Sequence, residues 1–295
     1  MLTVQTHAGR TGRWVHTPDS WQEASSLLSE HPLEAAVSGG ATYLMWRAAQ
    51  GEPMPDHLIC LHRITHHDEV LDGSVGALAS LRRVERGPTT GAQRALTMAA
   101  GVTAGPAVRT LATIGGNLAS GFPKADLVPA LLALDATVHL GDGRQVPVGE
   151  VVEKGLRTED LVTRVTHGLA DQENWSGATV KLSRRGMDLS TVTVSAVLRV
   201  EGDEIVEAGL AAGSLFERPT RLRSIEAALV GADTSEETVR EVLAFARLVG
   251  TPFLDDEEAT SSYRQRVATA VIRKAILLAA RLGPSDSPRV GDARI

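Results

Sequence analysis

Cysteine and aromatic residues are the scarcest features of this 295-residue sequence. A single cysteine, Cys60, excludes an intramolecular disulfide and any iron–sulfur cluster held by four cysteines of this chain. Cys60 stands in an apolar stretch, which favours a buried, inert thiol. Phe, Trp and Tyr make up 3% of the residues, whereas hydrophobic residues together make up 43%, so we expect a core of Leu, Val, Ala and Ile.

The sequence also lacks a basic tract, a long apolar run and an apolar leader. Its formal charge of −6 and its scattered basic residues give no support to nucleic-acid binding. No run approaches the ~20 apolar residues that span a bilayer, so we expect no membrane association. Residues 1–6 lack the basic and apolar regions of a signal peptide. We therefore expect a cytoplasmic protein.

The familiar catalytic motifs are missing as well. The sequence contains no Gly-x-Gly-x-x-Gly, P-loop, His-Glu-x-x-His or Gly-x-Ser-x-Gly motif. Among nine histidines only His66 and His67 are adjacent, and such a pair on a loop is more often solvated than metal-bound. The sequence therefore predicts no metal site and identifies no catalytic residue.

Two glycine pairs are the most informative feature that is present. Residues 37–42 (Val-Ser-Gly-Gly-Ala-Thr) and 113–117 (Thr-Ile-Gly-Gly-Asn) each place Gly-Gly beside small hydroxyl or amide residues. Glycine lets the main chain approach a ligand closely, so that successive N–H groups can point at a pyrophosphate. Neither loop contains lysine or arginine, which favours binding through dipoles and hydrogen bonds. A turn or a bulge is the competing interpretation, and the pattern alone leaves both open.

Local signals predict several elements of the first half. Ser20 and Glu23 have the spacing of a capping box and predict a helix over 20–30. Apolar patterns predict three further elements, namely a strand over 35–37, a helix over 127–134 and a hairpin over 137–148.

A polar stretch over 170–176 is the best candidate for a linker, and the pattern changes beyond it. Alternating apolar and polar residues predict a strand over 192–200, and a turn leads into a second strand over 205–210. Three helices follow, the second opening at Thr234 and the third at Ser262.

Beyond these patterns, the chain resembles a known family. Residues 112–118 (Ala-Thr-Ile-Gly-Gly-Asn-Leu), followed by 125–136, closely resemble the FAD-binding medium subunit of molybdenum hydroxylases of the carbon monoxide dehydrogenase and xanthine dehydrogenase type. Residues 38–42 fall where the family has an Ala-Gly-Gly-Thr-Asp-like loop. Residues 181–185 look like its Lys-Phe-x-Arg-Arg strand, and 261–264 resemble the start of its last helix. The resemblance extends nearly end to end.

The resemblance implies FAD as the cofactor, with both glycine loops cradling its pyrophosphate. The residues that it implies as cofactor-binding are Val37, Ser38, Gly39, Gly40, Ala41, Thr42, Thr103, Thr113, Ile114, Gly115, Gly116, Asn117, Asp126, Leu161 and Lys181.

Four of these residues have separate implied roles. Asp126 would accept hydrogen bonds from the adenosine ribose, and N-capping of the helix from Leu127 is the alternative. Lys181 would lie near the isoalloxazine, where a cation stabilises negative charge on the reduced ring, and an exposed strand lysine is the alternative. Thr103 would lie close to the adenosine or the ring system, and Leu161 would form a wall of the site.

The sequence departs from the family in the first glycine loop and at the redox end of the site. Ala41 and Thr42 replace the common Thr and Asp or Ser, and Tyr43 stands where leucine is usual. Thr179 and Val180 precede Lys181, where many relatives have an aromatic residue that packs on the flavin. The sequence therefore offers no clear stacking partner for the ring.

The resemblance implies an α+β fold. A two-lobed FAD-binding domain of the PCMH type, built from two small α/β lobes, would cover residues 1–172. A C-terminal domain with an antiparallel sheet and three helices would cover 173–282, and 283–295 would form a flexible tail. FAD would lie across the two lobes with its ring facing the second domain.

The implied function is that of an FAD-dependent oxidoreductase subunit in electron transfer. In the family, electrons pass from a molybdopterin-binding large subunit through a [2Fe–2S] small subunit to the flavin and on to an acceptor. The alternative is a stand-alone tailoring enzyme that catalyses a cyclisation or rearrangement, with FAD retained without redox use or lost. A third interpretation is a flavin-binding module with a purely structural duty in a complex.

Overall fold

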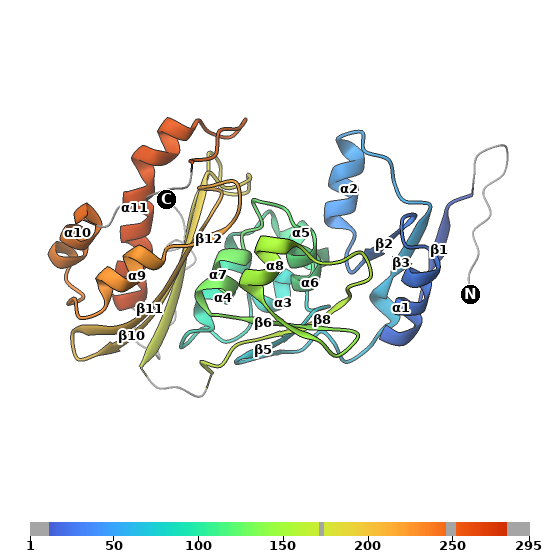
Figure 1. Cartoon of the computed structure of the whole chain (residues 1–295), viewed down its shortest axis with the longest axis horizontal. Coiled ribbons are helices and arrows are strands. Elements are labelled where there is room, and N and C mark those ends of the chain that lie inside the picture. The colour runs from blue at the N-terminus through green and yellow to red at the C-terminus, as the bar shows by residue number, and fades with distance from the viewer. Residues whose placement is uncertain (1–11, 171–173, 246–251, 282–295) are drawn as a thin grey trace.

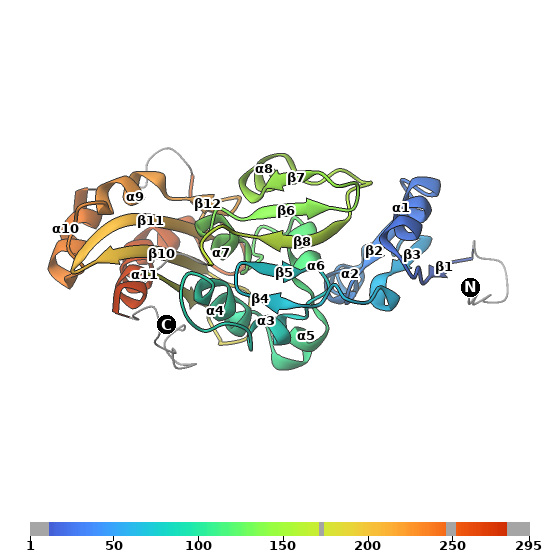
Figure 2. The ribbon, with the colours of Figure 1, turned by 90° about the horizontal axis from the view of Figure 1, so that it is seen from below.

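The computed structural model describes residues 12–170, 174–245 and 252–281. Three bodies follow one another along the long axis of the molecule: an N-terminal lobe, a central lobe and a C-terminal domain (Figure 1). The same order holds in the perpendicular view of Figure 2. Within these ranges, no helix combines the length and the apolar character needed to cross a bilayer.

The N-terminal lobe is built on a three-stranded parallel sheet in the order β1-β3-β2. Its elements are β1 (Trp14–His16), α1 (Trp21–Glu30), β2 (Ala35–Ser38), α2 (Thr42–Ala49), β3 (His57–Cys60) and the 3₁₀ turn η1 (Leu61–Arg63). The predicted first helix is confirmed, since Ser20 Oγ accepts a hydrogen bond from the Glu23 amide at 3.1 Å and begins α1. Because β2 ends at Ser38, the first glycine pair leaves the carboxyl edge of the sheet.

The central lobe contains a five-stranded sheet in the order β4-β5-β8-β6-β7, with antiparallel neighbours throughout. Its strands are β4 (Val70–Leu71), β5 (Ser74–Gly76), β6 (Thr137–Leu140), β7 (Gln145–Pro147) and β8 (Val162–Thr166). Its helices are α3 (Leu81–Val84), α4 (Arg94–Val102), α5 (Pro106–Leu111), α6 (Ile114–Ala119), α7 (Val128–Ala133) and α8 (Val148–Lys154). The predicted hairpin is confirmed by the pairing of β6 with β7.

The C-terminal domain is a four-stranded antiparallel sheet in the order β12-β11-β10-β9 with helices on one side. Its elements are β9 (Trp175–Leu182), β10 (Val192–Glu201), β11 (Glu204–Gly213), β12 (Thr220–Arg221), α9 (Arg223–Leu229), α10 (Glu236–Phe245) and α11 (Ser261–Arg281). In Figure 1, α9, α10 and α11 cover one face, whereas α4 and α7 of the central lobe contact the other. The expected α+β class is confirmed. Ser235, rather than Thr234, begins α10, because its Oγ accepts from the Thr238 amide at 3.2 Å.

The polar stretch over 170–176 only partly corresponds to a linker. Trp175 and Ser176 already belong to β9 and are 5% and 4% exposed. Ser176 Oγ donates a hydrogen bond to the Ala279 carbonyl oxygen at 2.6 Å, so a polar side chain in this stretch is buried with a partner. Residues 171–173, where we expect the domain boundary, and the expected tail over 283–295 lie outside the described residues.

The hydrophobic cores do not follow the division into three bodies. Trp175, Val197 and Ala211 of the C-terminal sheet pack in the same cluster as α4 and α7 of the central lobe. A second cluster fills the space between that sheet and α9–α11. The N-terminal lobe has a smaller core, formed by Ala24, Leu28, Ile59, Leu61, Ile64 and, from the central lobe, Leu161.

Candidate cofactor-binding site

A cavity of about 430 Å³ lies where the N-terminal lobe meets the central lobe. Residues 37–44, which include the first glycine loop and the start of α2, form one side of it. Leu81 of α3, parts of α5 and α6, and the loops that follow α4, α5 and α6 form the other side. Leu189 adds a contribution from the C-terminal domain. The cavity therefore touches all three bodies of the molecule.

The two glycine loops contact each other directly. A Cβ atom on Gly40 would lie 1.7 Å from the carbonyl oxygen of Leu111, and one on Gly39 would lie 2.6 Å from Oγ1 of Thr113. The first distance is far inside van der Waals contact with main-chain atoms, which have little freedom to move. Gly40 is thus required by the close approach of two protein segments, whatever ligand lies beside it, whereas a Cβ on Gly39 would displace the Thr113 side chain.

The main-chain N–H groups of the second glycine loop are bonded within the protein. The Ile114 amide donates to the Ala79 carbonyl oxygen at 3.0 Å, and the Gly115 amide donates to the Ala77 carbonyl oxygen at 2.9 Å. The Gly116 amide donates to Thr113 Oγ1 at 3.1 Å, so the Thr113 side chain caps α6. In this conformation the second loop therefore offers a ligand its side chains rather than these amides.

The first loop is different, because α2 starts without a cap. Ala41 is the N-cap residue, its φ is 56°, and no side chain of the described residues caps the helix. The first amides of a helix have no acceptor within the helix and carry the positive end of its dipole. Since Thr42, Tyr43 and Leu44 line the cavity, this helix end would suit an anionic group of a ligand there.

Asn117 supplies an independent indication of a ligand. Its Oδ1 is buried and has no hydrogen-bond partner in the described part of the chain, and the residue lines the cavity. A buried acceptor without a donor destabilises a protein by about 1–3 kcal/mol. A bound molecule with an O–H or N–H group would satisfy it. Together with the start of α2, Asn117 makes the cavity fit a ligand that carries both an anionic group and hydrogen-bond donors, as a dinucleotide does.

Tyr43, Trp46 and Phe122 form an aromatic wall of the cavity. Tyr43 stacks on Trp46 with ring centroids 5.7 Å apart, and Phe122 lies 5.5 Å and 5.4 Å from these two rings. In the sequence, Tyr43 stands out only as a departure from the family, and the wall that it forms with Trp46 and Phe122 was not predicted. The available signal was the three-residue spacing of Tyr43 and Trp46, which places both on one face of a helix.

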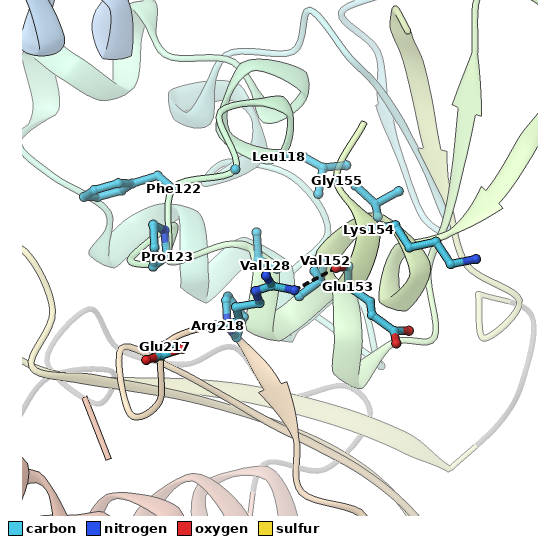
Figure 3. A pocket seen from close by; sticks show the side chains of 13 residues that line it. Leu118, Phe122, Pro123, Val128, Val152, Glu153, Lys154, Gly155, Glu217 and Arg218 are labelled. Atoms are coloured by element: carbon cyan, nitrogen blue, oxygen red, sulfur yellow. Dashed lines mark hydrogen bonds between the residues drawn. The ribbon is translucent and has the colours of Figure 1, made fainter. Parts of the chain in front are cut away.

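A second cavity, of about 330 Å³, lies on the other side of Phe122, between the central lobe and the C-terminal domain. Figure 3 shows Phe122 and Pro123 on one side of it and Arg218 on the other. Arg218 Nη1 donates to the carbonyl oxygen of Glu153 at 2.7 Å, so this guanidinium joins the two bodies. The second cavity contains none of the predicted site residues.

Most of the predicted cofactor-binding residues line the first cavity: Val37, Ser38, Gly39, Gly40, Ala41, Thr42, Thr103, Thr113, Gly116 and Asn117. Ile114 and Gly115 lie beneath it, against the strand and loop at Ala77 and Ala79. Leu161 packs in the core of the N-terminal lobe. The structure gives these last three residues packing roles, and their contact with the cofactor stays a prediction.

Asp126 and Lys181 pair with each other, and neither residue lines the cavity. Lys181 Nζ lies 2.7 Å from Asp126 Oδ2, and Thr193 Oγ1 donates to Oδ1 at 2.6 Å. The two residues are 5% and 2% exposed, so Lys181 is not an exposed strand lysine. Asp126 does not cap α7 either, since no side chain in the described ranges caps that helix. Their roles at the ribose and the isoalloxazine stay predictions.

Cys60 is free and half-buried at the end of β3. Burial raises the pKa of its thiol, which keeps the sulfur protonated at neutral pH. This supports its interpretation as an unreactive thiol.

The fold and the cavity define a cofactor-binding protein of two lobes and a C-terminal domain, and comparison with known proteins identifies the family. Residues 8–166 match the family described as "FAD binding domain in molybdopterin dehydrogenase". Residues 178–279 match the family described as "CO dehydrogenase flavoprotein C-terminal domain". The chain belongs to the FAD-binding medium subunits of the molybdenum hydroxylases, as its motifs indicate, and FAD is its cofactor.

Individual relatives match over most of their length. The glyceraldehyde dehydrogenase medium chain of Sulfolobus acidocaldarius is 24% identical over 270 residues, covering 87% of this chain and 94% of that protein. The carbon monoxide dehydrogenase medium chain of Afipia carboxidovorans is 23% identical over 280 residues, covering 88% and 94%. These relatives are parts of oxidoreductases.

Solved structures share the fold. A crystal structure of Cu,Mo-CO dehydrogenase in its cyanide-inactivated form matches with a TM-score of 0.83 at 22% identity, covering 91% of this chain and 98% of that one. Quinoline 2-oxidoreductase from Pseudomonas putida 86 matches with a TM-score of 0.81 at 24% identity, covering 92% and 97%.

Proposed function

We propose that this chain transfers electrons. It would receive them from a [2Fe–2S] small subunit, supplied in turn by a molybdopterin-binding large subunit, and pass them through FAD to an external acceptor. The observation that carries the cofactor-binding part of the proposal is the presence of an uncapped helix end, at α2, and the unpartnered Asn117 Oδ1 in one cavity. The electron-transfer part is supported by the family to which the chain belongs. When bound, FAD supplies the redox chemistry, because it can take up and release electrons.

The residues of this chain would bind and orient the cofactor. The first amides of α2 would hold the pyrophosphate, and Asn117 Oδ1 would accept a hydrogen bond from a ribose hydroxyl or a ring N–H. The wall of Tyr43, Trp46 and Phe122 would keep water from an aromatic ring of the cofactor. None of these tasks requires an acid or a base from the protein.

The composition supports a division of labour between chains. Because Cys60 is the single cysteine of this sequence, it does not supply four thiolates to an iron–sulfur cluster, so the [2Fe–2S] clusters of this proposal would come from a partner. Met45 on α2 and Val108 and Leu111 on α5 are 57%, 40% and 60% exposed. Val108 also lines the cavity. This apolar surface beside the cofactor site suits the docking of such a partner.

The test is a comparison of the isolated chain with the assembled complex. We expect the isolated chain to carry one FAD, with an absorption band near ~450 nm that dithionite bleaches. Addition of the partner subunits and an organic substrate should bleach the same band, whereas the substrate alone should not.

Two outcomes would contradict the proposal. One is a chain that neither contains FAD nor takes it up. The other is turnover of a substrate by the isolated chain with no change in the oxidation state of the flavin, which would favour a stand-alone tailoring enzyme.

A further inference from the structure

Three histidines that are distant in the sequence meet in the N-terminal lobe. His16 ends β1, His57 begins β3, and His31 follows the last residue of α1. The parallel register pairs Trp14 with His57, and alternate residues of a strand share a face, so His16 and His57 lie on the same face of the sheet. His31 reaches them from the helix that packs on this sheet.

The ring nitrogens of these histidines converge. One ring nitrogen from each residue lies within 4.8 Å of the other two. His16 Nε2 lies 2.9 Å from His57 Nδ1, and the rings of His31 and His57 stack with centroids 3.5 Å apart. Two imidazoles on one tetrahedral Zn²⁺, with Zn–N bonds of about 2.0–2.1 Å, hold their nitrogens roughly 3.3 Å apart. An ion could therefore replace the proton that His16 and His57 share. The His31 ring, which is stacked on His57 with an angle of 19° between the ring planes, would have to turn out of this stack to offer its nitrogen to the same ion.

The main chain fixes the position of His57, because its amide donates to the Glu34 carbonyl oxygen at 3.0 Å. An imidazole nitrogen that carries no proton has a free lone pair that can bind a metal ion.

We propose that His16, His31 and His57 form a binding site for one Zn²⁺ ion, with water completing the coordination. Three imidazoles suit this borderline cation, and zinc sites with three protein ligands keep a position open to water. The three histidines are half-buried, so the ion can enter from solvent.

This site is separate from the cofactor cavity. His57 pairs with Ala35 at the amino end of β2, whereas Ser38 at its carboxyl end leads into the cavity. None of the three histidines lines that cavity. The ion would join β1, β3 and the end of α1, the elements that surround the small core of this lobe. Its role is to stabilise the lobe, so binding can be tested independently of electron transfer.

The test uses the full-length holoprotein without a histidine tag, freed of metal by a chelator. Zn²⁺ is titrated in competition with a chromophoric chelator, and thermal unfolding is recorded with and without the ion. We expect one Zn²⁺ per chain and a higher Tm when it is bound. The variants His16→Ala and His57→Ala should each weaken binding at least about 10-fold. His62→Ala, which removes an exposed histidine just beyond β3, should leave the affinity unchanged.

The absorption of bound Co²⁺ provides a second measurement. Intense visible bands at a stoichiometry of one ion per chain, absent from His57→Ala, would support the site. Circular dichroism of each variant shows whether it has folded, and the milder His16→Gln replaces any variant that has not. Failure of the wild-type chain to bind Zn²⁺ would overturn the proposal. So would unchanged Zn²⁺ binding in a folded chain from which all three histidines have been removed.

Discussion

The ammonium group of Lys181 lies 2.7 Å from the carboxylate of Asp126, which stands 55 residues earlier in the sequence. Lys181 belongs to β9 of the C-terminal domain, whereas Asp126 precedes α7 of the central lobe. Lys181 Nζ also donates to the carbonyl oxygen of Val102 at 3.2 Å, at the end of α4. A buried ion pair therefore joins the C-terminal sheet to two helices of the neighbouring body.

Removal of one partner of this pair should destabilise the fold strongly. Lys181→Met leaves the carboxylate of Asp126 buried without its counter-ion, and we expect a loss of about 3–5 kcal/mol in the free energy of unfolding, measured in urea. Lys181→Met combined with Asp126→Leu should recover part of that loss, because both charges are gone. Thr193→Val, which removes only the hydrogen bond to Asp126 Oδ1, should cost about 1–3 kcal/mol.

A double variant no more stable than Lys181→Met would show that the ion pair is not the source of the loss in stability.

Asp126 also allows a test of the predicted contact with the adenosine ribose. Asp126→Asn should weaken FAD binding more than FMN binding, because FMN lacks the adenosine ribose, and equal losses would contradict that contact.

A negative charge at the start of α2 should interfere with FAD binding. Thr42 is the first residue of α2 and lines the cavity, so Thr42→Asp places a carboxylate where the pyrophosphate is expected. We expect the FAD affinity to fall at least about 10-fold, as measured by fluorescence titration, since repulsion of about 1.4 kcal/mol already produces that change. A carboxylate in the first turn favours the helix itself, so the stability of the protein should not fall.

Thr42→Asn is the matched control, because it has nearly the same shape and no charge. It should bind FAD within about 3-fold of the wild type. Equal affinities of the Asp and Asn variants would place the pyrophosphate elsewhere.

The contact between the two glycine loops should be intolerant of a single methyl group. In Gly40→Ala the new Cβ would lie 1.7 Å from the Leu111 carbonyl oxygen, so the N-terminal lobe must shift away from the central lobe. We expect a lower Tm and a loss of FAD, measured on the same preparation. Gly149→Ala, on α8, is the control, since its Cβ would meet only Leu132 Cδ2, at a distance of 4.0 Å. It should be neutral or stabilise the protein by up to about 1 kcal/mol.

The stability of the protein should fall in mild acid through His167. Its Nε2 lies 2.6 Å from Gln93 Oε1, and the Leu169 amide donates to its Nδ1 at 3.2 Å, so the structure holds the neutral form. Burial lowers the pKa of His167 from 6.5 to about 4. As the pH falls below 6.5, the unfolded chain takes up this proton first. The contribution of neutral His167 is therefore complete above pH 6.5 and is lost as the pH falls toward 4.

Urea unfolding between about pH 7 and about pH 5 measures this loss, which has an upper limit of about 1.4 kcal/mol per pH unit. His167→Gln should give a shallower dependence on pH, whereas His62→Gln, at an exposed position, should keep the wild-type slope. An unchanged slope in His167→Gln would show that this histidine does not titrate as its burial indicates.

Features that depend on neighbouring residues could be predicted from the sequence. The Ser20 cap, the β6–β7 hairpin and the strand β10 each follow from spacings within a few residues, and all three are present. The alternation of apolar and polar residues did not predict that both faces of β10 are buried. The glycine loops were also recognisable, because glycine pairs beside small polar residues form a local pattern. Their contact with each other was not, since it depends on how two lobes pack.

The remaining features required the tertiary structure. Asp126 has the sequence context of a ligand-binding carboxylate, yet the packing of two bodies gives it a lysine partner. His16, His31 and His57 show no metal-binding spacing, because the sheet order β1-β3-β2 and the position of α1 bring them together. The aromatic wall likewise joins α2 to a loop of the central lobe.

The division of the hydrophobic cores has a consequence for how a large dinucleotide enters. The central lobe and the C-terminal domain share one core, so they can separate only by exposing much of it to water. The core of the N-terminal lobe is smaller, and Leu161 is its one buried member from the central lobe. We therefore expect this lobe to swing outward at a lower free-energy cost and to widen the cavity that the two lobes share. We expect the amides of β2 and β3 to exchange with solvent deuterium sooner than those of β10, and bound FAD to slow that exchange.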